Sequence, residues 1–240
     1  MDSARQVIVA LDFDNVHAAE VIVERLGDAG QSYKIGLELL TAAGPALATR
    51  LAAEGKDVFL DLKLFEIPTS VARAVRAAGR LGATMVTVHG LGGARIMEAA
   101  VRAAADFPRL RVLALTVVTS LTDVDLAQVG ISATTEEQVT RLARLARDAG
   151  CHGVVASPQE AATLRTQLGP DVLIVTPGVQ LRTELSEGAV TEHARSADPT
   201  AAIRAGATHV VIGRSLTRAT DPAAVLADLS AELSRLTNRR

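Results

Sequence analysis

Residues 58–90 read "VFLDLKLFEIPTSVARAVRAAGRLGATMVTVHG" and contain two short apolar runs separated by an Ala- and Arg-rich segment. The two runs are apolar almost throughout, without strict alternation, which is typical of strands covered on both faces, as in a parallel sheet. The segment between them has helical spacing and reaches Gly82, a residue type that commonly ends helices. The stretch therefore predicts a strand–helix–strand unit.

The same unit recurs along the whole chain. Eight apolar runs are predicted to be strands, at residues 7–13, 32–37, 57–64, 84–90, 111–119, 153–158, 173–179 and 209–215. Eight strand–helix units in 240 residues indicate an α/β fold of the (β/α)₈ TIM barrel type, which typically takes about 250 residues. An open doubly wound sheet is the alternative, but it normally has fewer strands at this length. We expect residues 1–240 to form a single barrel domain.

Composition excludes several classes of partner. The net charge is −2 and the pI is about 6.2, so no electrostatic signature of nucleic-acid or membrane binding is present. Aromatic residues make up only 2% of the chain, which argues against a base-stacking surface. No apolar run is long enough to span a membrane. The single cysteine, Cys151, cannot form an internal disulfide and is expected to be a small buried apolar residue. We expect a cytoplasmic protein.

Charged side chains gather where the predicted strands end. Asp61 and Lys63 are two residues apart on one strand and therefore share a face, and Lys34 on the neighbouring strand can reach the same volume. Burying such charges is costly unless they compensate one another. The carboxyl ends of barrel strands carry the active site in this fold, so we interpret these residues as a functional cluster, with a structural ion pair as the alternative. Asp12 could join the cluster or only cap the next helix, and His89 could act there or only orient its loop.

The last two predicted strands carry a second signal. The motifs "TPGV" (176–179) and "IGRSLT" (212–217) offer glycine amides and one guanidinium where these barrels frequently bind phosphate. Pro177, Gly178, Gly213 and Arg214 are the candidates, and ordinary turn glycines with a surface arginine are the alternative. Two long polar connections, after the fifth and seventh strands, are candidate lids.

These blocks resemble a known family. "DLKLFEIPTSV" resembles the Asp-x-Lys-x-x-Asp-Ile-Pro-x-Thr signature of the orotidine 5′-monophosphate decarboxylases, and "ALDF", "YKIGLEL", "VTVHG", "LTVVTSL", "VTPGV" and "IGRSLTRATDP" match the family's other blocks in order. The resemblance covers residue 7 to about residue 222. It implies a barrel homodimer that converts orotidine 5′-monophosphate to uridine 5′-monophosphate and carbon dioxide in pyrimidine biosynthesis, with no metal and no organic cofactor.

The resemblance also implies roles for single residues. Lys63 would place its ammonium beside pyrimidine C6, with Asp61 close to the substrate carboxylate. Asp12 and Lys34 would hold ribose hydroxyls, and Lys34 would also join the charge network. The remaining contacts would come from Ser120 to the pyrimidine, from Gly178 and Arg214 to the phosphate, and from Glu66, Ile67 and Ser70 to the partner subunit's site.

The sequence departs from the family pattern at several positions. Glu66 replaces the second Asp of the signature, Phe65 replaces a His and Ser70 replaces a Thr. His193 lies where a Gln that contacts phosphate and base is expected. Because an error of about 1 Å at a reacting centre can cost on the order of 10²-fold in rate, Glu66 leaves two alternatives open. One is a paralogue acting on a modified nucleotide or another phosphorylated substrate, and the other is a nucleotide-binding protein with impaired catalysis.

Overall fold

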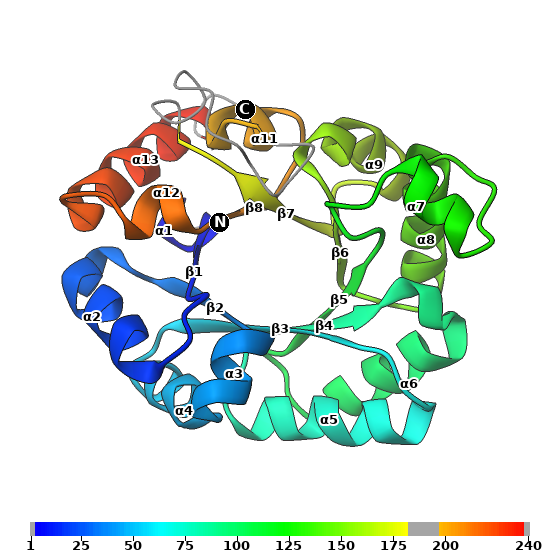
Figure 1. The fold of residues 1–240 in the computed structure, drawn as a ribbon, viewed down its shortest axis with the longest axis horizontal. Coiled ribbons are helices and arrows are strands. Elements are labelled where there is room, and N and C mark those ends of the chain that lie inside the picture. Colours follow the sequence, from blue (N-terminus) through cyan, green and yellow to red (C-terminus); the bar gives the residue numbers. More distant parts are fainter. Residues whose placement is uncertain (1–2, 182–196, 238–240) are drawn as a thin grey trace.

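The computed structural model describes residues 3–181 and 197–237, and its strands form a closed barrel (Figure 1). Each strand pairs in parallel with the next along the chain, and the last strand pairs with the first. The strands are β1 (Val7–Ala10), β2 (Ser32–Gly36), β3 (Asp57–Leu64), β4 (Met85–His89), β5 (Arg111–Leu115), β6 (Gly153–Val155), β7 (Leu173–Val179) and β8 (His209–Ile212). The predicted TIM barrel is confirmed.

Helices connect the strands and form the outer ring of the barrel (Figure 1). They are α1 (Ser3–Gln6), α2 (Val16–Leu26), α3 (Leu37–Ala43), α4 (Ala46–Ala53), α5 (Pro68–Arg80), α6 (Ala94–Ala104), α7 (Asp123–Gln128), α8 (Thr135–Asp148), α9 (Ala161–Leu168), α11 (Pro199–Arg204), α12 (Arg214–Thr217) and α13 (Pro222–Thr237). Three short 3₁₀ helices are η1 (Gly27–Ala29), η2 (Gly90–Gly92) and η3 (Pro158–Glu160). Among the helices of the described ranges, none is both long and apolar enough to cross a membrane.

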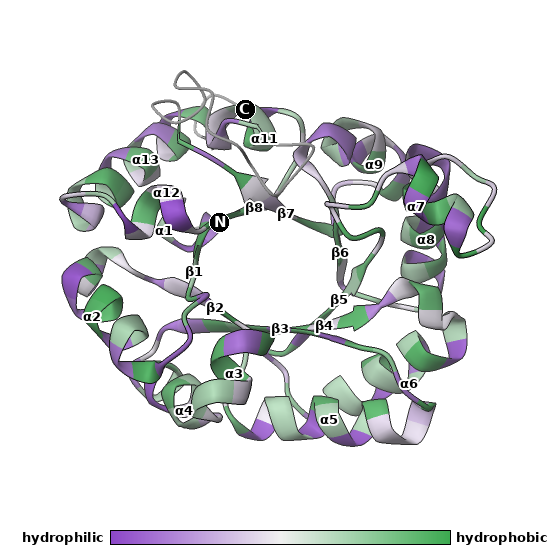
Figure 2. Cartoon of the chain, viewed as in Figure 1, coloured by the Kyte–Doolittle hydropathy of each residue, from purple (hydrophilic) through white to green (hydrophobic). Residues whose placement is uncertain are grey.

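The core has two layers, which explains why the strands read as continuous apolar runs. One layer fills the barrel and consists of Ile8, Ala10, Phe59, Leu113, Leu115, Val155, Val175 and Val211. The other, larger layer lies between the strands and the helices. Figure 2 shows hydrophobic strands surrounded by helices that carry both hydrophobic and hydrophilic residues. Strands buried on both faces are therefore apolar along most of their length.

Local sequence signals account for the helices that flank the site. Helix α5 begins at Pro68, whose fixed φ suits the first turn, and it buries Val71, Val75 and Ala78 at helical spacing. Helix α8 begins at a capping box, in which Thr134 and Glu137 each accept a hydrogen bond from the other's backbone amide.

Several strands end earlier than the apolar runs predict. The run at 7–13 is a strand only to Ala10, the run at 111–119 only to Leu115, and the run at 209–215 only to Ile212. Beyond these points the chain leaves the sheet and enters the loops and helices of the barrel rim. The connection after β5, which reads as a long polar loop, contains the short helix α7.

Candidate active site

Asp61 and Lys63 lie in a bulge of β3. Leu60 pairs with Val86 and Leu64 pairs with Val88, so four steps along β3 match only two along β4. Bulges bend a strand and redirect its side chains, and they are common beside active sites. Within this bulge Lys63 has a φ of 50°, and it is the one non-glycine residue of the described ranges with a positive φ.

Lysines and carboxylates alternate across the barrel mouth. Lys63 Nζ lies 2.9 Å from Asp61 Oδ2, and Lys34 Nζ lies 3.9 Å from the same oxygen. Lys34 Nζ also donates a hydrogen bond of 2.7 Å to Asp12 Oδ1. The Lys34 and Asp61 side chains are only 10% and 13% exposed, whereas Lys63 is 34% exposed. The predicted cluster is therefore assembled, and Lys63 is its more open ammonium.

The barrel register explains how Lys34 reaches both carboxylates. Its Cα is level with Ala10 and Phe59, which line the barrel interior. Asp12 and Asp61 follow these two residues by two positions, Asp12 just past the end of β1 and Asp61 within β3. The side chain must therefore extend toward the mouth. Gly36 leaves room for this contact, because a Cβ there would lie 3.1 Å from Asp12 Oδ1 and 3.2 Å from Lys34 Nζ. Asp12 does not cap α2, since that position is taken by Asn15, whose side chain accepts from Ala18 N.

Thr87 is a member of the site that the sequence reading missed. It is fully buried on β4 and is level with Leu113, a residue of the barrel interior. Its hydroxyl donates to Asp61 Oδ1 at 3.0 Å and accepts from the backbone amide of Lys63 at 2.9 Å. The available signal was its place in "TMVTVHG", two residues before His89 on the same face of the strand.

His89 mainly organises its own loop. Its Nδ1 accepts a hydrogen bond of 3.3 Å from Leu91 N at the start of η2, and its ring lies 5.6 Å from the ring of Phe65. Burial, followed by the charge of Lys63, lowers the pKa of His89 below its ordinary value of 6.5. A neutral imidazole with Nδ1 as acceptor carries its proton on Nε2. The imidazole thus adds no positive charge beside Lys63 at neutral pH.

A second bulge lies at the end of β7. Thr176 pairs with Val210 and Val179 pairs with Ile212, so an extra residue is accommodated at Pro177 and Gly178. Gly178 has a φ of 74°, which favours glycine. On the adjacent strand, Gly213 precedes α12 and Arg214 is its first residue, with an exposed side chain. The four candidate phosphate residues therefore lie at the ends of two neighbouring strands.

The other predicted residues lie apart from the charged cluster. Glu66 is exposed, and its carboxylate accepts a hydrogen bond of 2.6 Å from the amide of Ile67. Ile67 is 61% exposed, Ser70 is half-buried in α5, and Ser120 is exposed in the turn after β5. His193 lies outside the described residues.

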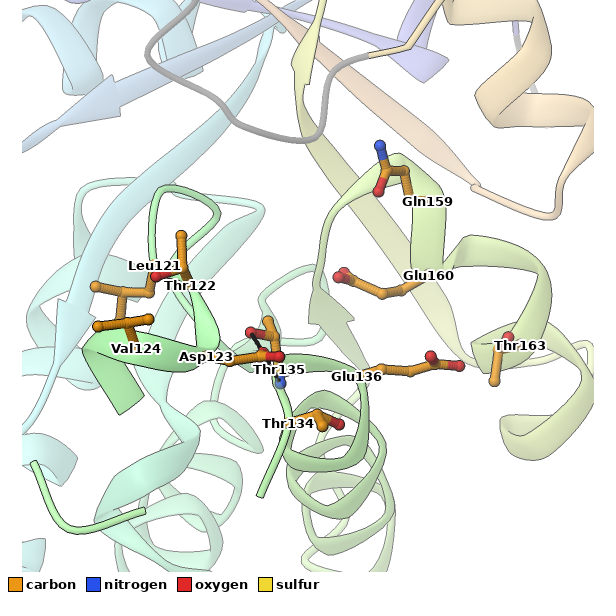
Figure 3. A pocket seen from close by; sticks show the side chains of 10 residues that line it. All are labelled: Leu121, Thr122, Asp123, Val124, Thr134, Thr135, Glu136, Gln159, Glu160 and Thr163. Atoms are coloured by element: carbon orange, nitrogen blue, oxygen red, sulfur yellow. Dashed lines mark hydrogen bonds between the residues drawn. The ribbon is translucent and has the colours of Figure 1, made fainter. Parts of the chain in front are cut away.

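A separate cavity of about 750 Å³ opens between the loops after β5 and β6 (Figure 3). Its lining includes Asp123, Glu136 and Glu160 with several threonines. Two of these carboxylates accept hydrogen bonds from backbone amides: Asp123 Oδ1 from Thr135 N at 2.7 Å, and Glu160 Oε2 from Ser157 N at 2.7 Å. We therefore interpret these carboxylates as supports for the ends of α8 and η3.

Cys151 is buried and distant in sequence from every member of the cluster. Burial raises the pKa of its thiol to about 12. Because the thiolate is the reactive form, this environment suits the predicted apolar role and not a nucleophile.

Known proteins match this chain over nearly its whole length. The family model described as "Orotidine 5'-phosphate decarboxylase / HUMPS family" matches residues 5–229. A protein named orotidine 5′-phosphate decarboxylase from Chromobacterium violaceum is 47% identical over 229 residues, covering 95% of this chain and 91% of that protein. One of the same name from Nitrosococcus oceani is 42% identical over 98% of this chain and 100% of its own length.

A solved structure shares both fold and sequence. The crystal structure of orotidine 5′-phosphate decarboxylase from Lactobacillus acidophilus has a TM-score of 0.83 and 35% sequence identity, and the match covers 95% of this chain and 98% of that one. The family model, the curated relatives and the solved structure agree over nearly the whole chain. This chain therefore belongs to the orotidine 5′-phosphate decarboxylase / HUMPS family.

Proposed function

We propose that the protein decarboxylates orotidine 5′-monophosphate to uridine 5′-monophosphate, a step of pyrimidine biosynthesis, with Lys63 acting at pyrimidine C6. The observation that carries this proposal is the array Asp12–Lys34–Asp61–Lys63 at the barrel mouth, in which Lys63 Nζ lies 2.9 Å from Asp61 and is the more exposed ammonium. The relatives that are 42–47% identical bear the name of this activity.

The chemistry requires a fixed cation. When the bond between C6 and the carboxylate breaks, carbon dioxide leaves and the electron pair stays on C6 in an orbital orthogonal to the ring π-system. The ring therefore offers no electron sink. An ammonium held where this charge develops stabilises the transition state more than the ground state. Lys63 then donates a proton from Nζ to C6, which completes the product.

Asp61 acts on the ground state and on the position of Lys63. Its Oδ1 accepts a hydrogen bond from Thr87 and its Oδ2 accepts one from Lys63. These two bonds hold the carboxylate beside the Lys63 ammonium, next to the proposed position of pyrimidine C6. In this site the substrate carboxylate lies near Asp61, and their repulsion is relieved as carbon dioxide departs. Preorganised charges of this kind cost no rearrangement at the moment of reaction.

The rest of the nucleotide supplies binding energy. Asp12 and Lys34 hold ribose hydroxyls, Ser120 contacts the base, and Pro177, Gly178, Gly213 and Arg214 surround the phosphate. His193 is assigned to the phosphate and base by sequence resemblance alone. The binding energy of the phosphate and ribose contacts can be used to orient the substrate and the site around pyrimidine C6. These contacts therefore raise kcat as well as affinity.

The active unit is a homodimer in which Glu66, Ile67 and Ser70 reach the partner subunit's site. Two observations support this. Phe65 and Ile67, in the short segment between β3 and α5, are 59% and 61% exposed, and a dimer would cover them. The exposed Glu66 carboxylate contacts the Ile67 amide, and its described contacts do not include the array of its own subunit. We also place the protein in the cytoplasm, consistent with its single buried cysteine.

A second function stays open because of Glu66. The family description also includes the HUMPS branch, and Glu66 is one methylene longer than the Asp of the decarboxylase signature. A paralogue acting on another phosphorylated substrate, or a binding protein with impaired turnover, would retain the same barrel.

The test is release of carbon dioxide from orotidine 5′-monophosphate by the purified wild-type protein and by Glu66→Asp, each with and without magnesium. Turnover by wild type without added metal supports the proposal. A folded wild type that binds uridine 5′-monophosphate without turnover, and gains turnover in Glu66→Asp, supports the impaired binding protein. A wild type that turns over only a different phosphorylated compound in a substrate panel supports the paralogue.

A further inference from the structure

The Thr87 side chain lies between Asp61 and Lys63 and contacts both. It faces the barrel interior from β4 with no exposed surface, opposite the bulge of β3. The single hydroxyl makes two hydrogen bonds within 3.0 Å, one to the Asp61 side chain and one to the Lys63 main chain. One side chain thus joins the carboxylate and the backbone that carries the ammonium.

The direction of these two bonds is fixed by chemistry. A backbone amide can only donate, so Thr87 Oγ1 accepts from Lys63 N. An ionised carboxylate can only accept, so the hydroxyl proton must point to Asp61 Oδ1. The hydroxyl is therefore not a free rotor, and both of its roles are satisfied at once. Buried polar networks of this fully satisfied kind confer rigidity.

The first bond compensates for the bulge. Because two extra residues of β3 are accommodated between Leu60 and Leu64, Lys63 lacks the regular ladder geometry toward β4. Its positive φ of 50° is a conformation that residues with a Cβ seldom adopt. The Thr87 hydroxyl supplies an acceptor for this part-buried amide, and so holds the backbone from which the Lys63 side chain leaves.

The second bond assigns different roles to the two oxygens of Asp61. Oδ1 is held by Thr87 at 3.0 Å, whereas Oδ2 lies 2.9 Å from Lys63 Nζ and 3.9 Å from Lys34 Nζ. If the hydroxyl were absent, rotation of the carboxylate could exchange the two oxygens and move the ammonium with them. The bond therefore fixes both members of the pair relative to each other.

We propose that Thr87 is a positioning residue for the decarboxylation, acting through Asp61 and Lys63 without touching the substrate. This role rests on the proposed function. It extends that function, because Thr87 lies outside the signature motif and yet positions two residues of the motif, Asp61 and Lys63. Its loss should affect the chemical step far more than nucleotide binding, because the ribose and phosphate contacts come from other strands.

The test compares Thr87→Val, which keeps the shape and removes the hydroxyl, with Thr87→Ser, which keeps the hydroxyl. Thr84→Val is the matched control, since Thr84 is also buried beside β4 and its hydroxyl binds Val58 O at 3.3 Å, near the opposite end of the strand. We expect Thr87→Val to lower kcat on the order of 10²-fold. KM and the inhibition constant of uridine 5′-monophosphate should stay within about threefold, and Thr87→Ser and Thr84→Val should retain kcat within the same margin.

Several outcomes would overturn the role. Unchanged kcat in Thr87→Val would do so, as would an equal loss in Thr84→Val or a rise of KM that matches the fall of kcat. If Thr87→Val does not fold, Thr87→Ala takes its place and is judged by the same criteria. Absence of turnover in folded wild type would instead overturn the proposed function, and with it any role in that reaction.

Discussion

Asp61 Oδ2 accepts a 2.9 Å hydrogen bond from the Nζ of Lys63, two residues further along the same strand. The pair is presented by a bulge of β3 and by the positive φ of Lys63, not by a regular strand. A second bulge presents Pro177 and Gly178 at the end of β7. The proposed reacting end and the proposed phosphate end of the nucleotide site therefore each lie at a bulge. At these positions a regular strand would place apolar side chains of the core, whereas the bulges present polar groups.

Lys63→Ala should remove turnover and leave the fold intact. The proposed reaction depends on one ammonium at C6, so we expect kcat to fall by at least about 10³-fold. Carbon dioxide release and thermal unfolding are the measurements. Lys56→Ala is the control, because Lys56 lies just before the other end of β3, and it should keep wild-type turnover. A Lys63→Ala protein with more than a tenth of wild-type kcat would contradict the assigned role.

The backbone at residue 63 predicts an unusual order of stability. A residue with a Cβ pays about 1 kcal/mol to occupy the left-handed region, whereas glycine does not. Lys63→Gly should therefore be more stable than Lys63→Ala by about 1 kcal/mol in urea unfolding, although both lack turnover. At Lys56, which has no positive φ, alanine should be at least as stable as glycine. A Lys63→Ala protein that is at least as stable as Lys63→Gly would show that the conformation at residue 63 carries no strain.

Ile67→Asp should separate the proposed dimer. Ile67 is 61% exposed, and burying a new carboxylate in a subunit interface is costly unless it is paired. We expect sedimentation to give the mass of a dimer for wild type and of a monomer for the variant, with turnover reduced because the partner's Glu66 and Ser70 are lost. Val129→Asp is the control, since Val129 is 70% exposed after α7. A dimeric, fully active Ile67→Asp would contradict the interface.

Much of the fold follows from the sequence because each strand is buried on both faces. The runs at 57–64 and 173–179 match β3 and β7 at both ends. The runs at 7–13 and 111–119 extend past their strands, since apolar residues also line the rim. A run of apolar residues indicates that a segment is buried, but it does not indicate which residues pair with a neighbouring strand. It therefore cannot show where a buried segment leaves the sheet. The short helix α7 was missed because its one buried residue, Leu126, gives no helical periodicity.

The sequence predicted the charged residues of the candidate site, but not the bulge of β3 or Thr87, which orient them. Asp12, Lys34, Asp61 and Lys63 are recognisable because charges at the ends of buried strands need compensation, and the structure brings them together. The bulge of β3 has no signature in residue type, whereas Pro177 and Gly178 inside a predicted strand are residue types that often mark a bulge. Thr87 was missed because a buried threonine in a strand is common, and only the three-dimensional register places its hydroxyl opposite Asp61 and Lys63.

His209 should make the protein less stable in mild acid. It is buried at the start of β8, and its Nδ1 lies 2.9 Å from Thr208 Oγ1. Burial lowers its pKa to about 4, against an opposing effect of Asp57, a carboxylate that is already paired with Arg5 and Arg109. The unfolded chain, with a histidine pKa of 6.5, binds the proton more readily. The free energy of unfolding therefore falls as the pH drops from the unfolded toward the folded pKa.

The size of this effect can be isolated by substitution. Between about pH 7 and pH 5 the lowered pKa of His209 accounts for roughly 2 kcal/mol of lost stability. Urea unfolding of His209→Gln at the two pH values should show a difference smaller by about that amount, even if the variant is less stable overall. His17→Gln, at an exposed histidine, should keep the wild-type difference. A His209→Gln protein with the full wild-type pH dependence would mean that the pKa of His209 is the same in the folded barrel as in the unfolded chain, so that Asp57 would have to offset the effect of burial.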